Sequence, residues 1–328
     1  MTSPLPIAPP THGRKRVLIL KPGYSETLDP DEGGVVSLGD ILRSTVILHL
    51  FPPEEYEVTW VVDQKGVPLL RGNPYISRLL VINPFTPHLL LSEWFDIVIN
   101  FEKEPGICAV ADRIPAWRRY GFRLDPTTHR PLAYDLSDEA LSYTTDLHAK
   151  RRKAKSWSSI LYEMLGENYR DQSYILGYQP RSQVCHDVGL NHLIGQKFPL
   201  KRWPEERWHQ LHDRLTGDFR VSWQEGANDI EDYIDWIHSC RVLVTNDSLG
   251  LHIALALGKP VVALFGPTVA TEVTAPNLHT LTPEVDWSCI PCLESRCLQT
   301  VPCMEHISVA TVEAALRRQL QALEVSPS

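Results

Sequence analysis

The chain of 328 residues lacks both long apolar runs and an excess of basic residues. No stretch approaches the roughly 18 apolar residues of a membrane-spanning helix. The Pro-rich start, MTSPLPIAPPTHGRKR, contains no apolar signal core. Against 32 Lys and Arg residues stand 40 Asp and Glu residues, for a formal net charge of −8, whereas general nucleic-acid binders are usually basic. These absences predict a cytoplasmic protein without a nucleic-acid partner.

Two common nucleotide-binding motifs are also absent. The chain contains neither the GxGxxG pattern of dinucleotide-binding folds nor the GxxxxGKS/T pattern of a P-loop. A dinucleotide-dependent oxidoreductase and a P-loop kinase are therefore disfavoured.

Apolar strands alternate with helical segments in two successive parts of the chain, which is typical of parallel α/β sheets. Strands are predicted in the first part at Val17 to Leu20, Val58 to Val62, Leu79 to Ile82 and Phe95 to Asn100. The pattern restarts after residues 177–180 with VGLN, FRVSW, VLVT and VVALFG. We expect a loose tail at 1–14, one domain at 15–178, a second at 179–306 and a C-terminal helix at 307–328.

A mostly helical segment at the end of the first part carries a run of basic residues. The run consists of Lys150, Arg151, Arg152, Lys153 and Lys155. It is either a solvated helix face or a surface for an anionic acceptor or membrane headgroups.

Polar residues follow the strand VLVT at the point where the next helix begins. Asn246, Asp247 and Ser248 stand there, and Gly250 and His252 follow within the first helical turn. Open α/β sheets bind ligands at the carboxyl ends of their strands, and a helix start offers N–H groups and a positive dipole end to an anion. The pattern therefore indicates an anion site. The alternative is a simple helix cap at Asp247 or Ser248, with His252 as a core residue.

Two lysines precede this segment, in the loop between a strand and a helix of the same part. In GQKFPLKRW, the ammonium groups of Lys197 and Lys201 could reach a phosphate at the neighbouring helix start. A solvated role for both lysines is the alternative.

Four of the seven cysteines lie close together, while Cys108, Cys185 and Cys240 are scattered and are expected to be buried free thiols. The crowded four, in CIPCLESRCLQTVPC, are Cys289, Cys292, Cys297 and Cys303. Such crowding in a cytosolic chain favours a metal over disulfides. Four thiolates suit iron or zinc, and because they leave no open position we expect a structural metal. The alternative is four buried thiols.

Three segments together resemble glycosyltransferase family 9, the ADP-heptose heptosyltransferases of bacterial lipopolysaccharide synthesis. They are KRWPEERW at 201–208, NDSLGLH at 246–252 and FGPT at 265–268. Gly39-Asp40 at the start of the first helix fits the same family, and the resemblance spans roughly residues 15 to 325. The usual family pattern has Gly two residues after the Asp, whereas Gly250 stands three residues after Asp247.

The resemblance implies an α/β fold of the GT-B class: two Rossmann-like domains whose parallel sheets face a central cleft. The N-terminal domain would bind the acceptor, and the C-terminal domain, with a cysteine finger at 287–304, the nucleotide-sugar. The residues it implies at the diphosphate are Lys197, Lys201, Asp247, Ser248, Leu249, Gly250 and His252. Glu225, just after a strand, is a candidate for the ribose.

By the same resemblance, Asp40 is the general base that takes the proton of the acceptor hydroxyl as the sugar is transferred with inversion. Its alternative role is to cap its helix. No catalytic metal is implied, because lysines and a helix start can offset the charge of the leaving diphosphate.

The implied activity is transfer of heptose from ADP-heptose, or a close nucleotide-sugar, to a hydroxyl of a protein or lipopolysaccharide-type acceptor. The cysteine finger resembles the autotransporter heptosyltransferase branch, where such a site is an iron finger and the acceptor is a protein. A homo-oligomer and a peripheral location at the inner membrane fit this interpretation. The alternatives are a GT-B enzyme that glycosylates a small metabolite, and a catalytically silent sugar-nucleotide-binding or scaffold protein.

Overall fold

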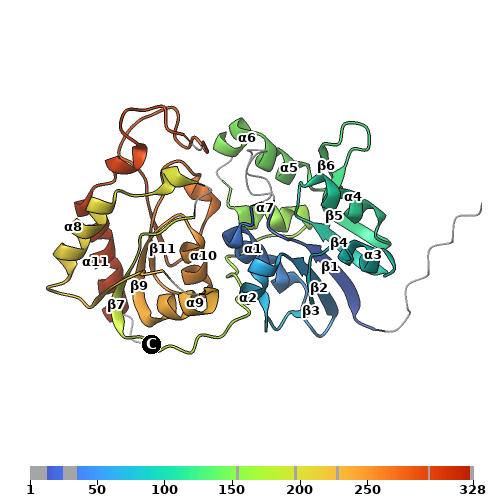
Figure 1. The fold of residues 1–328 in the computed structure, drawn as a ribbon, viewed down its shortest axis with the longest axis horizontal. Coiled ribbons are helices and arrows are strands. Elements are labelled where there is room, and N and C mark those ends of the chain that lie inside the picture. Colours follow the sequence, from blue (N-terminus) through green and yellow to red (C-terminus); the bar gives the residue numbers. More distant parts are fainter. Residues whose placement is uncertain are drawn as a thin grey trace, which may run out of the picture. The chain divides into compact units, whose positions relative to one another are not determined.

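The computed structural model describes residues 13–24, 35–152, 155–195, 198–226, 229–294 and 296–325. The chain divides into two compact units. Unit 1 comprises residues 1–153 and 157–178, and unit 2 comprises residues 154–156 and 179–328. Each unit has its own sheet with helices around it (Figure 1).

A six-stranded sheet forms the centre of unit 1, in the order β3-β2-β1-β4-β5-β6. The strands are β1 (Lys15–Leu20), β2 (Tyr56–Val62), β3 (Ile76–Val81), β4 (Phe95–Asn100), β5 (Ala116–Leu124) and β6 (Pro131–Ala133). The first five pair in parallel and β6 pairs antiparallel with β5. Hydrophobic periodicity does not predict β5, because its sequence AWRRYGFRL carries three arginines and only two buried residues.

Helices follow the strands of unit 1. They are α1 (Leu38–Ser44), α2 (Val67–Leu70), α3 (Thr86–Leu91), α4 (Pro105–Arg113), α5 (Asp138–Thr145), α6 (Leu147–Arg152) and α7 (Trp157–Met164), with 3-10 turns η2 (Thr45–Leu50) and η3 (Gln64–Gly66). Helix α1 passes into η2 at Thr45. There, the Ser44 hydroxyl donates to the Asp40 carbonyl and the Thr45 hydroxyl to the Leu42 carbonyl, at 2.7 and 2.6 Å. Such side-chain bonds compete with the helical backbone ladder.

A five-stranded parallel sheet forms the centre of unit 2, in the order β11-β10-β9-β7-β8. The strands are β7 (His186–Asn191), β8 (Val221–Trp223), β9 (Cys240–Asn246), β10 (Val261–Leu264) and β11 (Leu278–Leu281). The helices are α8 (Glu205–Leu215), α9 (Ile230–Ser239), α10 (Leu249–Ala256) and α11 (Val309–Val325), with 3-10 turns η4 (Pro199–Lys201), η5 (Ala270–Glu272) and η6 (Cys303–His306). The predicted alternation of strands and helices is therefore confirmed in both units.

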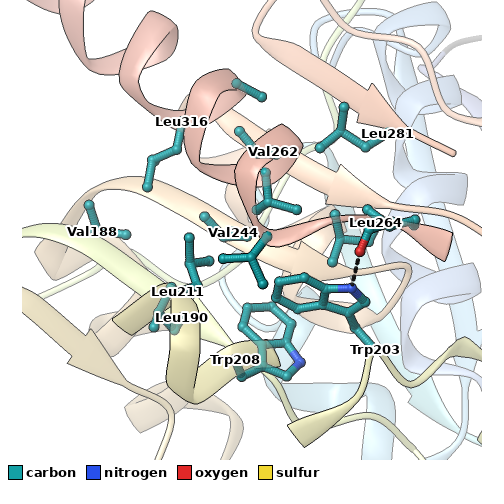
Figure 2. Packing of buried hydrophobic residues seen from close by; sticks show 14 of the residues in the cluster. Val188, Leu190, Trp203, Trp208, Leu211, Val244, Val262, Leu264, Leu281 and Leu316 are labelled. Carbon is teal, nitrogen blue, oxygen red and sulfur yellow. Dashed lines mark hydrogen bonds between the residues drawn. The ribbon is translucent and has the colours of Figure 1, made fainter. Parts of the chain in front are cut away.

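One face of the unit 2 sheet packs against α8 and α11. Alternate strand residues point to this face and pack with Trp208 of α8 and with Trp203, which precedes that helix (Figure 2). The two indole rings meet edge to face, with centroids 5.0 Å apart. The Trp203 indole N–H donates to the Ile307 carbonyl at 3.0 Å, which satisfies its polar group inside an apolar core. This bond fixes the segment that leads from Lys201 into α8.

Two helices of unit 2 begin at residues suited to a helix start. Pro204 stands immediately before α8 as the N-cap residue. Ser308 caps α11, because its hydroxyl oxygen accepts from the Thr311 N–H at 3.1 Å. Within the described part of the chain, no helix has the length and apolar character needed to cross a membrane.

Candidate functional site

The turn between β9 and α10, residues 246–250, is called the β9–α10 corner below. Asn246 ends β9 and is fully buried. Its side-chain oxygen accepts from the Trp203 N–H and its amide donates to the His192 carbonyl, both at 3.1 Å. One polar residue therefore ties together the loop after β7 and the segment before α8, at the carboxyl edge of the sheet where α/β folds bind ligands. This explains why an apolar strand ends in a polar residue.

Lys201 and Asp247 form an ion pair at this corner. The Lys201 Nζ lies 2.9 Å from the Asp247 Oδ2, and both side chains are only 12% exposed. Burial by itself would raise the pKa of Asp247, but the positive charges of Lys201 and His252 lower it to about 2. The Lys201 ammonium also lies 4.7 Å from the centre of the Phe198 ring. The lysine is thus held beside the start of α10.

A buried hydrogen-bond network holds the β9–α10 corner in place. The Asn191 amide donates to the hydroxyl oxygens of Thr245 and Ser248 at 2.7 and 3.0 Å, and Tyr233 donates to the Asn191 oxygen at 2.7 Å. A Cβ at Gly250 would lie 2.4 Å from both the Asn191 amide nitrogen and the Tyr233 hydroxyl. Glycine is therefore required at position 250 by this packing, whatever its relation to a ligand. The hydroxyl oxygen of Ser248, a residue expected at the diphosphate, thus accepts from the Asn191 amide.

The remaining residues expected at the nucleotide lie differently. His252 is buried in the first turn of α10, 6% exposed, and Leu249 is the first residue of that helix. Glu225 is exposed in the loop that follows β8. Lys197 lies outside the described residues. The structure thus brings Lys201, Asp247, Ser248 and His252 together and leaves Glu225 on the surface.

The cysteine finger lies against the loop that follows β10. The Leu293 N–H donates to the Pro267 carbonyl at 2.8 Å, and a Cβ at Gly266 would lie 2.9 Å from the Cys303 sulfur. Burial raises the pKa of the Cys303 thiol to about 11, and the other three thiols add to the shift: Cys292, Cys297 and Cys289. These effects indicate that the other three thiols lie in the neighbourhood of Cys303. Among the described residues, however, no group of three or more His, Cys, Asp or Glu side chains is arranged to hold a metal ion.

Unit 1 holds a buried group of charges around Asp40, on α1. Ser37 is the N-cap of this helix, and its hydroxyl oxygen accepts from the Asp40 N–H at 3.4 Å. The alternative that Asp40 caps its own helix is therefore wrong. Asp40 is 3% exposed and pairs with Lys21 and with the Arg43 Nε, the latter at 2.9 Å. Burial alone would raise the pKa of Asp40, but these two cations hold it well below its usual range.

Two charged residues of this group were not singled out from the sequence. Lys21 directly follows β1, and Glu102 comes two residues after β4. The two ends are neighbours because Leu20 pairs with Asn100 in parallel strands. A charged residue directly after an apolar strand is the signal that could have identified Lys21, whereas Glu102 follows its strand only after Phe101.

In fold, the chain is of the GT-B class, as shown by two solved structures that it resembles over most of its length. The first is an Escherichia coli ADP-heptose lipopolysaccharide heptosyltransferase II. The alignment covers 94% of this chain and 99% of that protein, with a TM-score of 0.62 and 14% identity. The second is TibC, a dodecameric iron-containing glycosyltransferase from enterotoxigenic Escherichia coli. The alignment covers 95% of this chain and 77% of TibC, with a TM-score of 0.59 and 13% identity.

The sequence comparisons lead to one family. Residues 226–301 match the model of glycosyltransferase family 9 (heptosyltransferase), and this confirms the resemblance stated from the motifs. The chain is 41% identical over 135 residues to lipopolysaccharide heptosyltransferase 2 of Salmonella typhimurium, covering 30% of this chain and 38% of the relative. It is 28% identical over 131 residues to lipooligosaccharide heptosyltransferase 2 of Haemophilus influenzae, covering 31% of this chain and 36% of the relative.

A third relative aligns over most of the chain at lower identity. It is lipopolysaccharide heptosyltransferase 1 of Pseudomonas aeruginosa, 22% identical over 311 residues, with 80% of this chain and 85% of the relative covered. The matches to the first two relatives span little more than a third of their length.

Proposed function

We propose that this protein is an inverting glycosyltransferase that transfers heptose from ADP-heptose, or a close nucleotide-sugar, to a hydroxyl of a protein or lipopolysaccharide-type acceptor. The observation that carries the proposal is that the family match at residues 226–301 includes the β9–α10 corner. At that corner a nearly buried lysine stands beside the start of a helix.

Unit 2 would hold the donor. The Lys201 ammonium would exchange its partner Asp247 for the diphosphate, and the N–H groups at the start of α10 would donate to the same phosphates. Both interactions strengthen as negative charge builds up on the leaving group. The proposal therefore needs no catalytic metal.

Unit 1 would supply the base. Asp40 would accept the proton of the acceptor hydroxyl as that oxygen forms a bond to the anomeric carbon. The bond between this carbon and the diphosphate oxygen breaks, and its electron pair leaves with the nucleoside diphosphate. A single displacement of this kind inverts the anomeric configuration.

The test measures binding and turnover separately. We expect ADP to raise the midpoint of thermal unfolding more than GDP or UDP, because a ligand of the native state stabilises by mass action. We expect Asp40→Asn to keep this shift while release of ADP from ADP-heptose falls by roughly 100-fold or more. The acceptors to supply are a heptose-free lipopolysaccharide-type glycolipid and a serine-rich protein. Unchanged turnover in the variant would remove Asp40 as the base, and ADP binding without any turnover would favour a silent binding protein.

We also propose that Cys289, Cys292, Cys297 and Cys303 hold one structural iron or zinc ion. Supporting this are the four soft donors, close together in the sequence, and the iron-containing neighbour TibC. The metal would pin a segment that has no helix or strand in its described part from 287 to 302.

We propose in addition that the protein forms a homo-oligomer, since the structural neighbour TibC is dodecameric. Light scattering of the purified chain tests it.

A further inference from the structure

Four charged side chains lie together at the carboxyl ends of β1 and β4, and they are called the Lys21 cluster here. They are Lys21, Asp40, Arg43 and Glu102. Lys21, Asp40 and Glu102 are 2%, 3% and 0% exposed. Two cations and two carboxylates thus share a site shielded from water, where each charge needs a nearby opposite charge.

Glu102 is bound in this cluster through only one of its two oxygens. Its Oε1 accepts from the Gly23 N–H at 2.6 Å and from the Tyr24 N–H at 3.1 Å, and lies 3.3 Å from the Lys21 Nζ. Its Oε2 is buried and has no hydrogen-bond partner among the described residues. A buried acceptor without a partner is costly, and such an atom in a native protein calls for an explanation.

Asp40, in contrast, uses both of its oxygens. The Oδ2 pairs with Lys21 and the Oδ1 accepts from the Arg43 Nε at 2.9 Å. These cations keep the pKa of Asp40 low, and a carboxylate of low pKa takes a proton poorly near neutral pH. For Asp40 to accept a proton, the Lys21 ammonium has to leave it. In a buried site the ammonium then needs another anion within reach.

We propose that Glu102 is a positioning residue that takes over the Lys21 ammonium as Asp40 accepts the acceptor proton. This inference rests on the proposed function, in which Asp40 is the base. Before transfer, Lys21 lies between two carboxylates. After transfer, the proton is on Asp40, Lys21 pairs with Glu102, and Oε2 of Glu102 supplies the acceptor that the ammonium lost.

Other charges around Asp40 are consistent with this exchange. Lys103 lies next to Glu102 in the chain and donates from its Nζ to the Thr144 carbonyl at 2.7 Å. Burial, followed by the positive charges of Lys150 and Lys21, lowers the pKa of Lys103 to about 8. The Lys103 ammonium thus binds the Thr144 carbonyl. Within the described part of the chain, Lys21 pairs with two carboxylates, Asp40 and Glu102.

The experiment compares pH profiles of Glu102→Gln and wild-type protein with ADP-heptose. Gln keeps an oxygen for the Gly23 and Tyr24 N–H groups but carries no charge, so Lys21 stays on Asp40. We expect kcat to fall about 10- to 100-fold with the donor KM unchanged. Loss of a neighbouring negative charge lowers the pKa of Asp40, so the acidic limb of kcat moves to lower pH. Glu102→Asp, which keeps the charge, restores part of the rate and returns the limb towards its wild-type position.

Glu104→Gln is the matched control, because this exposed residue lies in the same loop and accepts from the Ile107 N–H at the start of α4. It should leave rate and profile unchanged. If Asp40→Asn abolishes transfer while Glu102→Gln keeps the wild-type rate and profile, the inference is overturned and the proposed function stands. A lower rate with an unmoved acidic limb also overturns it, since that is the result of a purely structural role. If Glu102→Gln fails to fold, Glu102→Asp is compared with the wild type instead, because its shorter side chain draws the carboxylate away from Lys21. A lower kcat with a shifted acidic limb then supports the inference, and a wild-type rate and profile overturn it.

Discussion

At the scale of single residues, the Lys201–Asp247 pair makes the stability of unit 2 depend on pH. The folded-state pKa of Asp247 is about 2, below its usual value near 3.9. The pair therefore stabilises the fold above the unfolded-state pKa, by on the order of 2 kcal/mol, and loses this effect as the pH falls through the folded-state pKa.

We expect Asp247→Asn to be less stable than the wild type at pH 7, and the difference to shrink between pH 4 and pH 2. Denaturant unfolding at pH 7, 5 and 3 measures it. Asp213→Asn is the control, because the Asp213 side chain is 81% exposed, and its stability should follow that of the wild type throughout. A difference that stays constant from pH 7 to pH 3 would contradict the assignment.

At the scale of an element, the cysteine finger has little regular secondary structure. Its described part from 287 to 302 has neither helix nor strand, and its attachment to the β10 loop includes one backbone bond from Leu293 to Pro267. A segment of this kind gains order from a metal, because binding free energy becomes folding free energy.

Elemental analysis of freshly purified protein should find about one iron or zinc ion per chain. Cys297→Ser should remove the metal and lower the unfolding midpoint by several degrees, since 1 kcal/mol corresponds to roughly 2–4 °C for a domain of this size. Cys108 and Cys240 are buried as predicted, but the prediction was wrong for Cys185, which is exposed. Cys185→Ser, outside the finger, should change neither the metal content nor the unfolding midpoint. Metal-free wild-type protein, or a Cys297→Ser variant of full stability, would defeat the metal proposal.

At the scale of the whole molecule, unit 2 encloses a core of its own. The core runs from Val188 on β7 to Leu320 on α11, and α11 packs on α8, β9 and β10. We therefore expect residues 179–328, expressed alone, to unfold in one cooperative transition with the tryptophan emission of a buried indole.

A shorter fragment, residues 179–308, provides the control. It lacks α11 and with it Val312, Leu316 and Leu320, so the apolar face of the sheet stays uncovered. We expect it to show no cooperative transition. Equal behaviour of the two fragments would mean that α11 does not close the core.

The sequence predicted the strands that are apolar throughout and the polar residues that follow one of them. β1, β4, β9 and β10 were identified because both faces of a parallel sheet are covered, which leaves a continuous apolar run. β5 was not identified, since its arginines interrupt such a run. Lys21 and Glu102 were also missed, because only the pairing of β1 with β4 brings positions 21 and 102 together.

By itself, the sequence determined the fold class and the place of the β9–α10 corner, since both depend on local periodicity and on where a strand passes into a helix. Tertiary structure alone decided what the residues at these places contact. Gly250 is glycine because Asn191 and Tyr233 pack against it, and Lys201 is paired because Asn246 and Ile307 fix the Trp203 segment beside Asp247. Such contacts join residues far apart in the chain, and their distances follow from how the sheet and its helices pack.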